Sequence, residues 1–523
     1  MNIPFILEKA LNLYEHKEAV VCRDQRFTYG EFAKRVYALA HFLSSLGIRK
    51  RDRVAILHPN GHEFLESYFA AAQLGAILNP LNFRLSPSEL SFILNDSDAS
   101  VLISAPRYHE QVHALRSLET VLEKVVWTGG NTPPTGFEAF DYEEIVRSSP
   151  TDPPSVPDST DDDVVHLYYT SGTTGRPKGV MLSHRNVCTH ALSAIAELNL
   201  NDRDNWIHVA PLFHLADAWA TFAITWVGGK HVVVTDFEPV EVLSVMERER
   251  VTITNMVPTM LNILVNTPEV SGFDFSGLRA ILSGGAPIAP EVVRKIMATF
   301  KCDYVQTYGM TETSPYLTLS LLKENLVHLP EEDKFRFKAK TGRPFIGVLL
   351  RVVRDDGTDV NPDDREVGEI IVKGDIVTKG YWNRPEETAN ALRDGWLHTG
   401  DLAVIDREGY VNIVDRKKDM IITGGENVYS VEVENVLYMH PDVLEAAVIG
   451  VPDPKWGEAV TAVVVPKPNT QPSEADIIDF CKARIAHYKS PKSVVFISEL
   501  PKTGSGKIFK KGIRETARGQ VCS

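Results

Sequence analysis

The stretch YTSGTTGRPKG, residues 169–179, follows directly after an apolar run at residues 164–168. It holds three glycines, four Ser or Thr hydroxyls and two cations within eleven residues. Glycine lets the backbone approach a ligand closely, and the free N–H groups of such a loop bind phosphate oxygens. The G-x-x-x-x-G-K-[ST] spacing of a Walker A loop is absent. The stretch therefore predicts a strand ending in a phosphate-binding loop of another geometry, with an ordinary polar turn as the alternative.

Length and composition set the broad class of protein. A chain of 523 residues exceeds one hydrophobic core, so we expect two or more domains. Its 43% hydrophobic and 24% charged residues are typical of a soluble globular protein. The longest apolar-rich run, residues 218–229, is shorter than the roughly 18 residues of a membrane span. With scattered cysteines and no secretory signal, we expect a cytoplasmic protein with reduced thiols and no transmembrane segment.

The net charge is distributed unevenly along the chain. A value of −14 argues against a nucleic-acid partner. Residues 416–523 carry 15 Lys and Arg against 13 Asp and Glu, which leaves −16 on the remainder. The C-terminal part is therefore interpreted as a small domain that meets an anionic ligand on a larger acidic domain. A solvated helix end is the alternative.

Helical and strand-like segments alternate through most of the sequence. Residues 32–46 have helical spacing, residues 53–57 form a short apolar run typical of a buried strand, and residues 63–74 indicate a second helix. This alternation favours an α/β fold, with a large N-terminal region of stacked βαβ layers. Near residue 341 the pattern changes to short strands with Gly turns, which indicates a small β-barrel-like subdomain.

After residue 416 the pattern becomes helix, strand, strand and helix, which predicts a smaller α+β domain. We therefore expect an N-terminal domain of residues 1–415 and a C-terminal domain of residues 416–523. The charged segment 321–340 is predicted to be either a lid or a solvated helix.

Three further clusters carry groups that suit a nucleotide. The turn SGGAP, residues 283–287, follows an apolar strand and can press its backbone against a flat ligand, although an ordinary strand–helix turn fits it equally well. The segment QTYGMTET, residues 306–313, offers an aromatic face, hydroxyls and a carboxylate suited to Mg²⁺. The segment WLHTGD, residues 396–401, ends in an Asp that suits two ribose hydroxyls or an Asx-type turn.

Together these clusters resemble the family of adenylate-forming enzymes, which includes acyl-CoA synthetases, adenylation domains of peptide synthetases and beetle luciferases. The resemblance covers almost the whole chain, and its motifs follow the family order. They are TSGTTGRPKG at 170–179, APLFH at 210–214, GGAP at 284–287, YGMTET at 308–313, TGD at 399–401, DRKKD at 415–419 and PKTGSGK at 501–507.

The resemblance implies a reaction in two steps with ATP, Mg²⁺ and coenzyme A. A carboxylate attacks the α-phosphorus of ATP, and a thiol then displaces AMP from the acyl-adenylate. Medium- or long-chain fatty-acid–CoA ligases are the relatives that the sequence resembles. The family also implies that the C-terminal domain is mobile and rotates between the steps.

The resemblance also implies a role for each motif residue. The phosphates would be held by Thr170, Ser171, Gly172, Thr173, Thr174, Gly175 and Lys178, and the metal by Glu312 and Thr170. The adenosine site would comprise Gly284, Gly285, Ala286, Gln306, Thr307, Tyr308, Gly309, Asp401 and Arg416. Thr311 would contact the α-phosphate, and Lys507 would bridge the carboxylate and that phosphate. Lys418 would be the hinge, with Gly424, Gly425 and Glu426 forming the thiol tunnel.

The identity of the acid is predicted less sharply. His214 stands where amino-acid-activating relatives have an Asp, so an α-amino acid is not expected; His214 either gates the pocket in a catalytic role or is a packed imidazole. The expected wall is apolar, and its members are Leu215, Ala216, Trp219, Met256, Pro258, Met310 and Pro315. An apolar wall favours a medium or longer alkyl tail, with a compact aryl acid as the alternative.

Other functions share the same motifs. The acyl group could pass to a carrier protein instead of coenzyme A, or the enzyme could oxygenate a luciferin-type acid. A non-catalytic nucleotide-binding or scaffolding protein belongs to a different class, which the presence of Glu312, Asp401, Arg416 and Lys507 disfavours. Family members are monomers or homodimers, and the sequence does not decide between the two.

Overall fold

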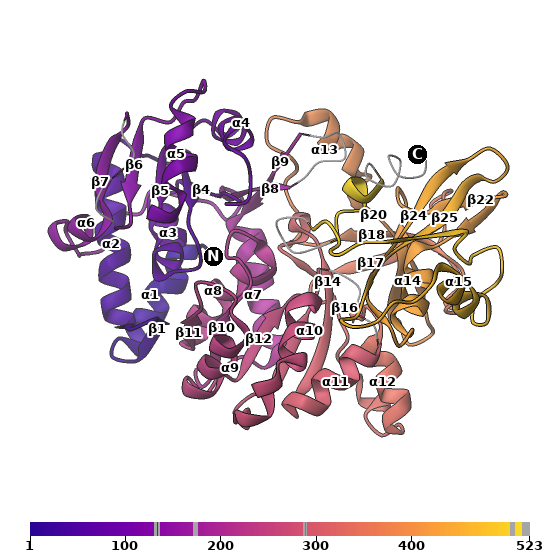
Figure 1. Ribbon diagram of the computed structural model, residues 1–523. Coiled ribbons are helices and arrows are strands. Elements are labelled where there is room, and N and C mark those ends of the chain that lie inside the picture. The colour runs from indigo at the N-terminus through magenta and orange to yellow at the C-terminus, as the bar shows by residue number, and fades with distance from the viewer. Residues whose placement is uncertain are drawn as a thin grey trace.

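The computed structural model describes residues 1–129, 133, 136–170, 176–285, 288, 290–502 and 508–514. It confirms the predicted α/β class, since helices alternate with parallel strands through the N-terminal part and a smaller α+β part follows (Figure 1). Within these ranges, no helix combines the length and apolar character needed to cross a membrane.

A large mixed sheet contains strands from both before and after the glycine-rich hairpin in sequence. Its inner strands, from β14 to β1, run parallel, and its edge pairs are antiparallel. The spatial order is β16 (Arg343–Pro344), β15 (Tyr316–Leu319), β14 (Asp303–Gly309), β13 (Ala280–Ser283), β12 (Ile253–Met256), β10 (Asn205–His208), β11 (Lys230–Val233), β1 (Glu18–Cys22) and β2 (Gln25–Thr28).

A second sheet contains the strand that precedes the glycine-rich loop. Its order is β7 (Glu138–Asp141), β6 (Lys124–Trp127), β5 (Ala99–Ser104), β3 (Arg53–Leu57), β4 (Ile77–Pro80), β8 (Val164–Thr170) and β9 (Lys178–Ser183). All neighbours are parallel except β8 and β9, which form the hairpin around the loop. Along β3, Val54 and Ile56 pack into one core while Ala55 and Leu57 pack into another. An apolar run without polar alternation is expected of such a strand, because both faces are buried.

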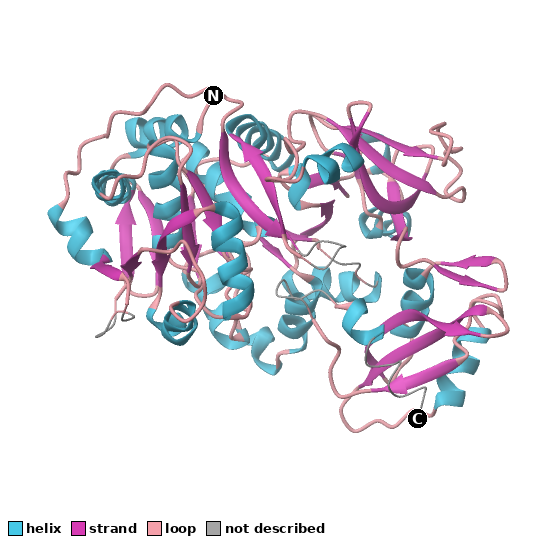
Figure 2. Cartoon of the chain, turned by 90° about the horizontal axis from the view of Figure 1, so that it is seen from above, coloured by secondary structure: helices cyan, strands magenta, loops and turns pink. Residues whose placement is uncertain are grey.

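Helices cover both faces of the two sheets and produce stacked layers (Figure 2). Between the sheets lie α1 (Ile3–Tyr14), α2 (Tyr29–Ser45), α3 (His62–Gln73), α7 (His184–Leu198) and α8 (Leu215–Val227). Outside the second sheet lie α4 (Pro87–Ser97) and α5 (His109–Leu115), while α6 (Tyr142–Ser148) packs on α2. Outside the first lie α9 (Pro239–Arg248), α10 (Pro258–Asn266), α11 (Pro290–Phe300) and α12 (Glu331–Ala339). Short 3-10 turns are η1 (Pro106–Tyr108), η2 (Pro268–Gly272), η3 (Thr311–Thr313) and η4 (Glu324–Leu326).

The charged segment 321–340 forms η4 and α12. Phe335 of α12 is buried against the first sheet, and the guanidinium of Arg294 lies 4.0 Å from the centre of its ring. One face of this segment is therefore packed, although it is rich in charge.

Two smaller sheets complete the chain. The first is antiparallel, with the order β17 (Leu349–Val353), β18 (Gly368–Lys373), β20 (Trp396–Ile405) and β19 (Leu392–Arg393), and with β21 (Val411–Arg416) also on β20. Helix α13 (Pro385–Ala391) precedes β19. The second has the order β23 (Glu426–Val428), β22 (Ile421–Thr423), β25 (Gly457–Pro466) and β24 (Val443–Asp453), with β26 (Ser493–Phe496) on β25 and with α14 (Ser430–Tyr438) and α15 (Glu474–Lys482) against it. The predicted boundary between residues 415 and 416 falls at the end of β21, close to the change of sheet.

Candidate active site

The predicted adenine turn lies against the neighbouring strand. Gly284 follows β13, and a Cβ atom on it would fall 2.1 Å from Thr307 Oγ1 on β14. The Thr307 hydroxyl donates a hydrogen bond to the Ser283 carbonyl at 3.1 Å. Gly285 has φ +83°, a conformation that favours glycine. The parallel strands β13 and β14 thus bring these motif residues together at their carboxyl ends, the edge where open α/β sheets bind ligands.

Three predicted residues from distant parts of the sequence form one cluster. The Tyr308 hydroxyl donates to Asp401 Oδ2 at 2.7 Å, and Arg416 Nε lies 3.2 Å from Asp401 Oδ1. Asp401 on β20 pairs with Arg416 on β21, so the sheet register holds their side chains together. Burial, together with the Asp401 carboxylate, raises the pKa of Tyr308 well above its usual range. The phenol therefore stays protonated and orients the carboxylate.

Glu312 is a buried carboxylate at the start of the segment after β14. Burial raises its pKa, because the surroundings disfavour its charged form. Its Oε1 accepts a hydrogen bond from the Tyr381 hydroxyl at 2.9 Å. Within the described ranges, no Lys or Arg forms a salt bridge with Glu312. The preceding residue, Thr311, opens η3 and is half-buried.

Tyr381, which the sequence did not single out, joins Glu312 to the glycine-rich hairpin. The backbone of residues 380–382 runs along β9, with Trp382 N donating to Gly179 O at 2.7 Å. Lys178 Nζ lies 5.3 Å from the centre of the Tyr381 ring. Thr170 ends β8 directly opposite Lys178. The hairpin and the Glu312 segment are therefore parts of the same region.

Some of the predicted site residues lie outside the described part of the chain, and others are packed within the fold. Residues 171–175, Ala286 and Lys507 lie outside the described residues. Gln306 is buried and its Oε1 accepts a hydrogen bond from Tyr304. A Cβ on Gly309 would meet the Pro315 carbonyl at 1.8 Å, so close backbone packing accounts for that glycine.

The buried carboxylate of Asp415 binds backbone groups on both sides of Lys418, the predicted hinge. Asp415 accepts hydrogen bonds from the backbone N–H of Arg416 at 2.7 Å and of Ser430 at 2.6 Å. Ser430 begins α14, so this side chain ties the end of β21 to the C-terminal part. Lys418 is exposed between the two. Arg514, near the end of the described chain, forms a salt bridge of 2.9 Å with Asp419.

The predicted thiol-tunnel residues form a tight hairpin. Gly424 and Gly425 have φ of +60° and +85° between β22 and β23, as a two-residue turn requires. A Cβ on Gly424 would lie 3.1 Å from the ring of Trp456, which is 41% exposed, and Lys455 Nζ is 4.7 Å from the centre of that ring. Sequence reasoning missed Trp456. Figure 1 shows β22 at the far side of the C-terminal part, away from β8, β9 and β14.

Three residues of the expected acid wall, Leu215, Ala216 and Trp219, lie at the start of α8, next to His214. The Ala216 carbonyl accepts hydrogen bonds from Trp219 Nε1 at 3.1 Å and from Asn255 Nδ2 at 2.6 Å. Trp219 also donates to the Tyr316 hydroxyl at 3.1 Å. Met256, predicted as part of this wall, instead packs in the core on the opposite face of β12. Asn255 is therefore the β12 side chain that contacts the wall.

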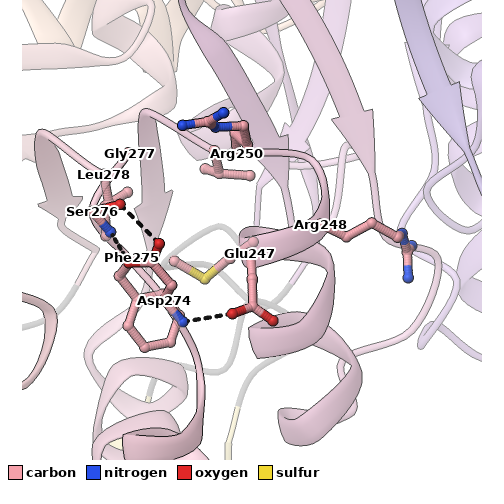
Figure 3. A pocket seen from close by; sticks show the side chains of 10 residues that line it. Glu247, Arg248, Arg250, Asp274, Phe275, Ser276, Gly277 and Leu278 are labelled. Carbon is pink, nitrogen blue, oxygen red and sulfur yellow. Dashed lines mark hydrogen bonds between the residues drawn. The ribbon is translucent and has the colours of Figure 1, made fainter.

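A surface pocket of about 390 Å³ lies elsewhere, between the end of α9 and the turn before β13 (Figure 3). Arg248, Arg250 and Glu247 line it, and the Asp274 N–H donates to Glu247 Oε1 at 2.7 Å. It lies at the amino ends of β12 and β13, whereas the motif residues lie at the carboxyl ends of the same strands. This pocket therefore belongs to the other edge of the sheet.

Family models and known proteins match the chain along nearly its whole length. The model of the AMP-binding enzyme matches residues 7–382, and that of the AMP-binding enzyme C-terminal domain matches residues 432–507. A feruloyl-CoA synthase from an Amycolatopsis species is 42% identical over 95% of this chain and 96% of its own. A long-chain-fatty-acid–CoA ligase of Mycobacterium tuberculosis is 38% identical over 98% of both chains.

A solved structure has the same fold over the full length. An anthranilate CoA ligase in complex with anthranoyl-AMP superposes with a TM-score of 0.90 at 28% identity, covering 100% of this chain and 98% of the other. The similarity thus includes the sheets that carry the motif cluster and the C-terminal part.

Proposed function

Since the chain belongs to the AMP-binding enzyme family and is an AMP-forming acyl-CoA synthetase, we propose that it activates a carboxylic acid with an apolar body. The acid's carboxylate attacks the α-phosphorus of ATP, which gives an acyl-adenylate and pyrophosphate. The thiol of coenzyme A then attacks the acyl carbon and AMP leaves. Neither step needs a covalent bond to the protein, so catalysis depends on positioning and on neutralising negative charge.

The observation that carries this proposal is the cluster of Tyr308, Asp401 and Arg416 near the Gly284 turn. Among the described residues each Asp401 oxygen has one partner, so lone pairs remain to accept hydrogen bonds from ribose hydroxyls. With its hydroxyl held by Asp401, the face of the Tyr308 ring is left to stack on adenine. The glycine turn, with no side chain at Gly284, would line the other side of that ring.

Glu312 fits a magnesium ion. It is a buried carboxylate with no salt bridge to a Lys or Arg among the described residues, and a hard cation would offset the cost of its burial. In that same part of the chain no group of three or more His, Cys, Asp or Glu forms a metal site, which agrees with Mg²⁺ held by few protein ligands plus phosphates. Bound there, Mg²⁺ would neutralise charge on the phosphates; Thr170 is the second proposed ligand.

We assign the remaining charge neutralisation to the other motif residues. Residues 170–175 and Lys178 would hold the β- and γ-phosphates, and Thr311 the α-phosphate. Lys507 would offset the negative charge that develops between the carboxylate and the α-phosphate. A lysine suits this role, because its charge is compact and its stem is flexible.

The second step would use the C-terminal residues 416–523 as a mobile domain. Rotation at Lys418 would bring the hairpin of Gly424, Gly425 and Glu426 to the adenylate. Trp456 lies against this hairpin with Lys455 beside it, and this pair suits the nucleotide end of coenzyme A. Asp415, which binds both sides of the hinge, would set the starting orientation.

Two classes of acid fit the wall at α8. An alkyl acid of medium or long chain suits apolar surroundings, because each buried CH₂ contributes about 0.8 kcal/mol. A compact aryl acid is the second candidate. It is favoured by the Trp219–Tyr316 hydrogen bond and by their rings, which pack edge to face at 5.1 Å and limit the depth of the wall.

AMP release with ATP, Mg²⁺ and coenzyme A tests the proposal across straight-chain acids from acetate to palmitate, with benzoate and cinnamate included. A maximum within either series supports the proposed function and fixes the acid class. If coenzyme A yields no AMP with any acid, while a purified carrier protein is acylated, the carrier-protein alternative replaces it.

A further inference from the structure

One buried amide in the acid wall has an unpaired oxygen. Asn255 on β12 is 3% exposed, and its Oδ1 has no hydrogen-bond partner among the described residues. Its Nδ2 donates to the Ala216 carbonyl at 2.6 Å, which fixes the amide so that the oxygen points elsewhere. A buried acceptor left without a donor costs on the order of 1–3 kcal/mol. Such a group in a native protein calls for an explanation.

Two other buried asparagines among the described residues, Asn60 and Asn186, are paired at both ends of the amide. Asn60 donates to the Ala210 carbonyl at 2.9 Å and accepts from the Leu212 N–H at 2.8 Å. Asn186 donates to two backbone carbonyls and accepts from the Ser183 N–H at 2.8 Å. Asn79 also has an Oδ1 without a hydrogen-bond partner among the described residues, but it lies on β4 in the other large sheet.

The position of Asn255 distinguishes it from Asn79. Asn255 lies on the face of β12 toward α8, since its neighbour two residues before, Ile253, packs in the core between the sheets. Its partner Ala216 is two residues after His214 and also accepts from Trp219. Asn255 thus contacts the proposed acid wall through Ala216, near the carboxyl end of a parallel strand.

We propose that the acid carries a hydroxyl or N–H group on its apolar body, and that this group donates a hydrogen bond to Asn255 Oδ1. The inference rests on the proposed function, because it concerns the same acid site. An amide oxygen can only accept, so an ether or an unsubstituted ring or chain leaves it unpaired. A site built around such an acceptor discriminates strongly against analogues that lack the donor.

Matched acids test this directly. Each set has a parent acid, its hydroxylated form and its methoxylated form: 3-phenylpropionate with ring substituents at each position, and octanoate with a terminal substituent. The wild-type enzyme is expected to prefer one donor-bearing acid over its parent and its methyl ether by about 10- to 100-fold in kcat/KM, the effect of one unmade buried hydrogen bond. Equal kcat/KM values within every set would overturn the proposal.

The variant Asn255→Leu isolates the amide. It should lower kcat/KM for the donor-bearing acid by about 10- to 100-fold and leave or raise the value for the parent, so that the preference disappears. Asn79→Leu is the matched control, since it removes a buried amide with the same unpaired oxygen from the other sheet. It should keep the preference. If Asn255→Leu does not fold, as judged by thermal unfolding, Asn255→Ala replaces it with the same expectation.

The outcomes separate the two proposals. If no acid of any set supports AMP release or pyrophosphate exchange, the proposed function fails. If acids are activated but Asn255→Leu lowers kcat/KM equally for parent and hydroxylated forms, the function stands and the hydrogen-bond inference fails. In that case the amide has a structural role, with its oxygen bonded to a buried water.

Discussion

Removing the Tyr308 hydroxyl should weaken ATP binding without changing the acid site. In Tyr308→Phe, Asp401 Oδ2 loses its hydrogen bond of 2.7 Å, and the carboxylate retains its contact with Arg416 through Oδ1. A hydrogen bond to a charged group contributes about 1.5–3 kcal/mol. At about 1.4 kcal/mol per tenfold change, KM for ATP should rise roughly 10- to 100-fold.

The assay is initial-rate AMP release, with ATP, acid and coenzyme A varied in turn. Only KM for ATP should change, because the contacts of the acid wall at α8 and of the Gly424 hairpin do not involve this hydroxyl. Tyr142→Phe is the matched control, since Tyr142 also donates to a buried carboxylate, Glu66, but between α6 and α3. It should lower the melting temperature and leave KM for ATP unchanged. A KM for ATP within twofold of wild type in Tyr308→Phe would refute the assignment.

Three further predictions follow from other parts of the structure. Glu312→Gln removes the buried charge that suits a cation, so half-maximal AMP release should require at least about tenfold more Mg²⁺; an unchanged Mg²⁺ titration would contradict this role. Gly284→Ala places a Cβ 2.1 Å from Thr307 Oγ1 and should reduce both the melting temperature and ATP affinity, whereas Gly272→Ala, where no atom lies within 4 Å, should change neither. Burial lowers the pKa of His166 to about 3, against about 6.5 in the unfolded chain. Below pH 6.5 the unfolded state therefore binds a proton that the folded state does not, and the free energy of unfolding decreases as the pH falls. Lowering the pH from 6.5 to 5 should reduce the free energy of unfolding by about 2 kcal/mol because of this histidine. Urea unfolding at both pH values should show a correspondingly smaller decrease for His166→Phe. An equal decrease in both proteins would contradict this expectation.

Local pattern was sufficient to predict most of the fold. The apolar run at residues 53–57 is β3, and the helical spacing at residues 32–46 falls within α2 almost entirely. These segments can be predicted from the sequence because burial on one or both faces sets the periodicity of their apolar residues. The residue types of Tyr308 and Asp401 suggested an adenosine site, whereas Arg416 was expected beside them from the family resemblance alone.

Residues that act through distant contacts were not predictable in the same way. Tyr381 meets Glu312 across 69 residues, and Trp456 meets Gly424 only because β22 pairs with β25. Met256, expected in the acid wall, packs in the core on the face of β12 opposite to Asn255. Adjacent strand residues face opposite sides, so only the observed packing of β12 shows that Asn255 faces α8.

In the proposed reaction the motif cluster forms an acyl-adenylate before coenzyme A takes part. Exchange of labelled pyrophosphate into ATP, measured without coenzyme A and with the best acid of the panel, tests it most directly. We expect exchange that depends on the acid, with AMP accumulating only after coenzyme A is added. Acid-dependent AMP release with coenzyme A but no exchange in its absence would contradict it.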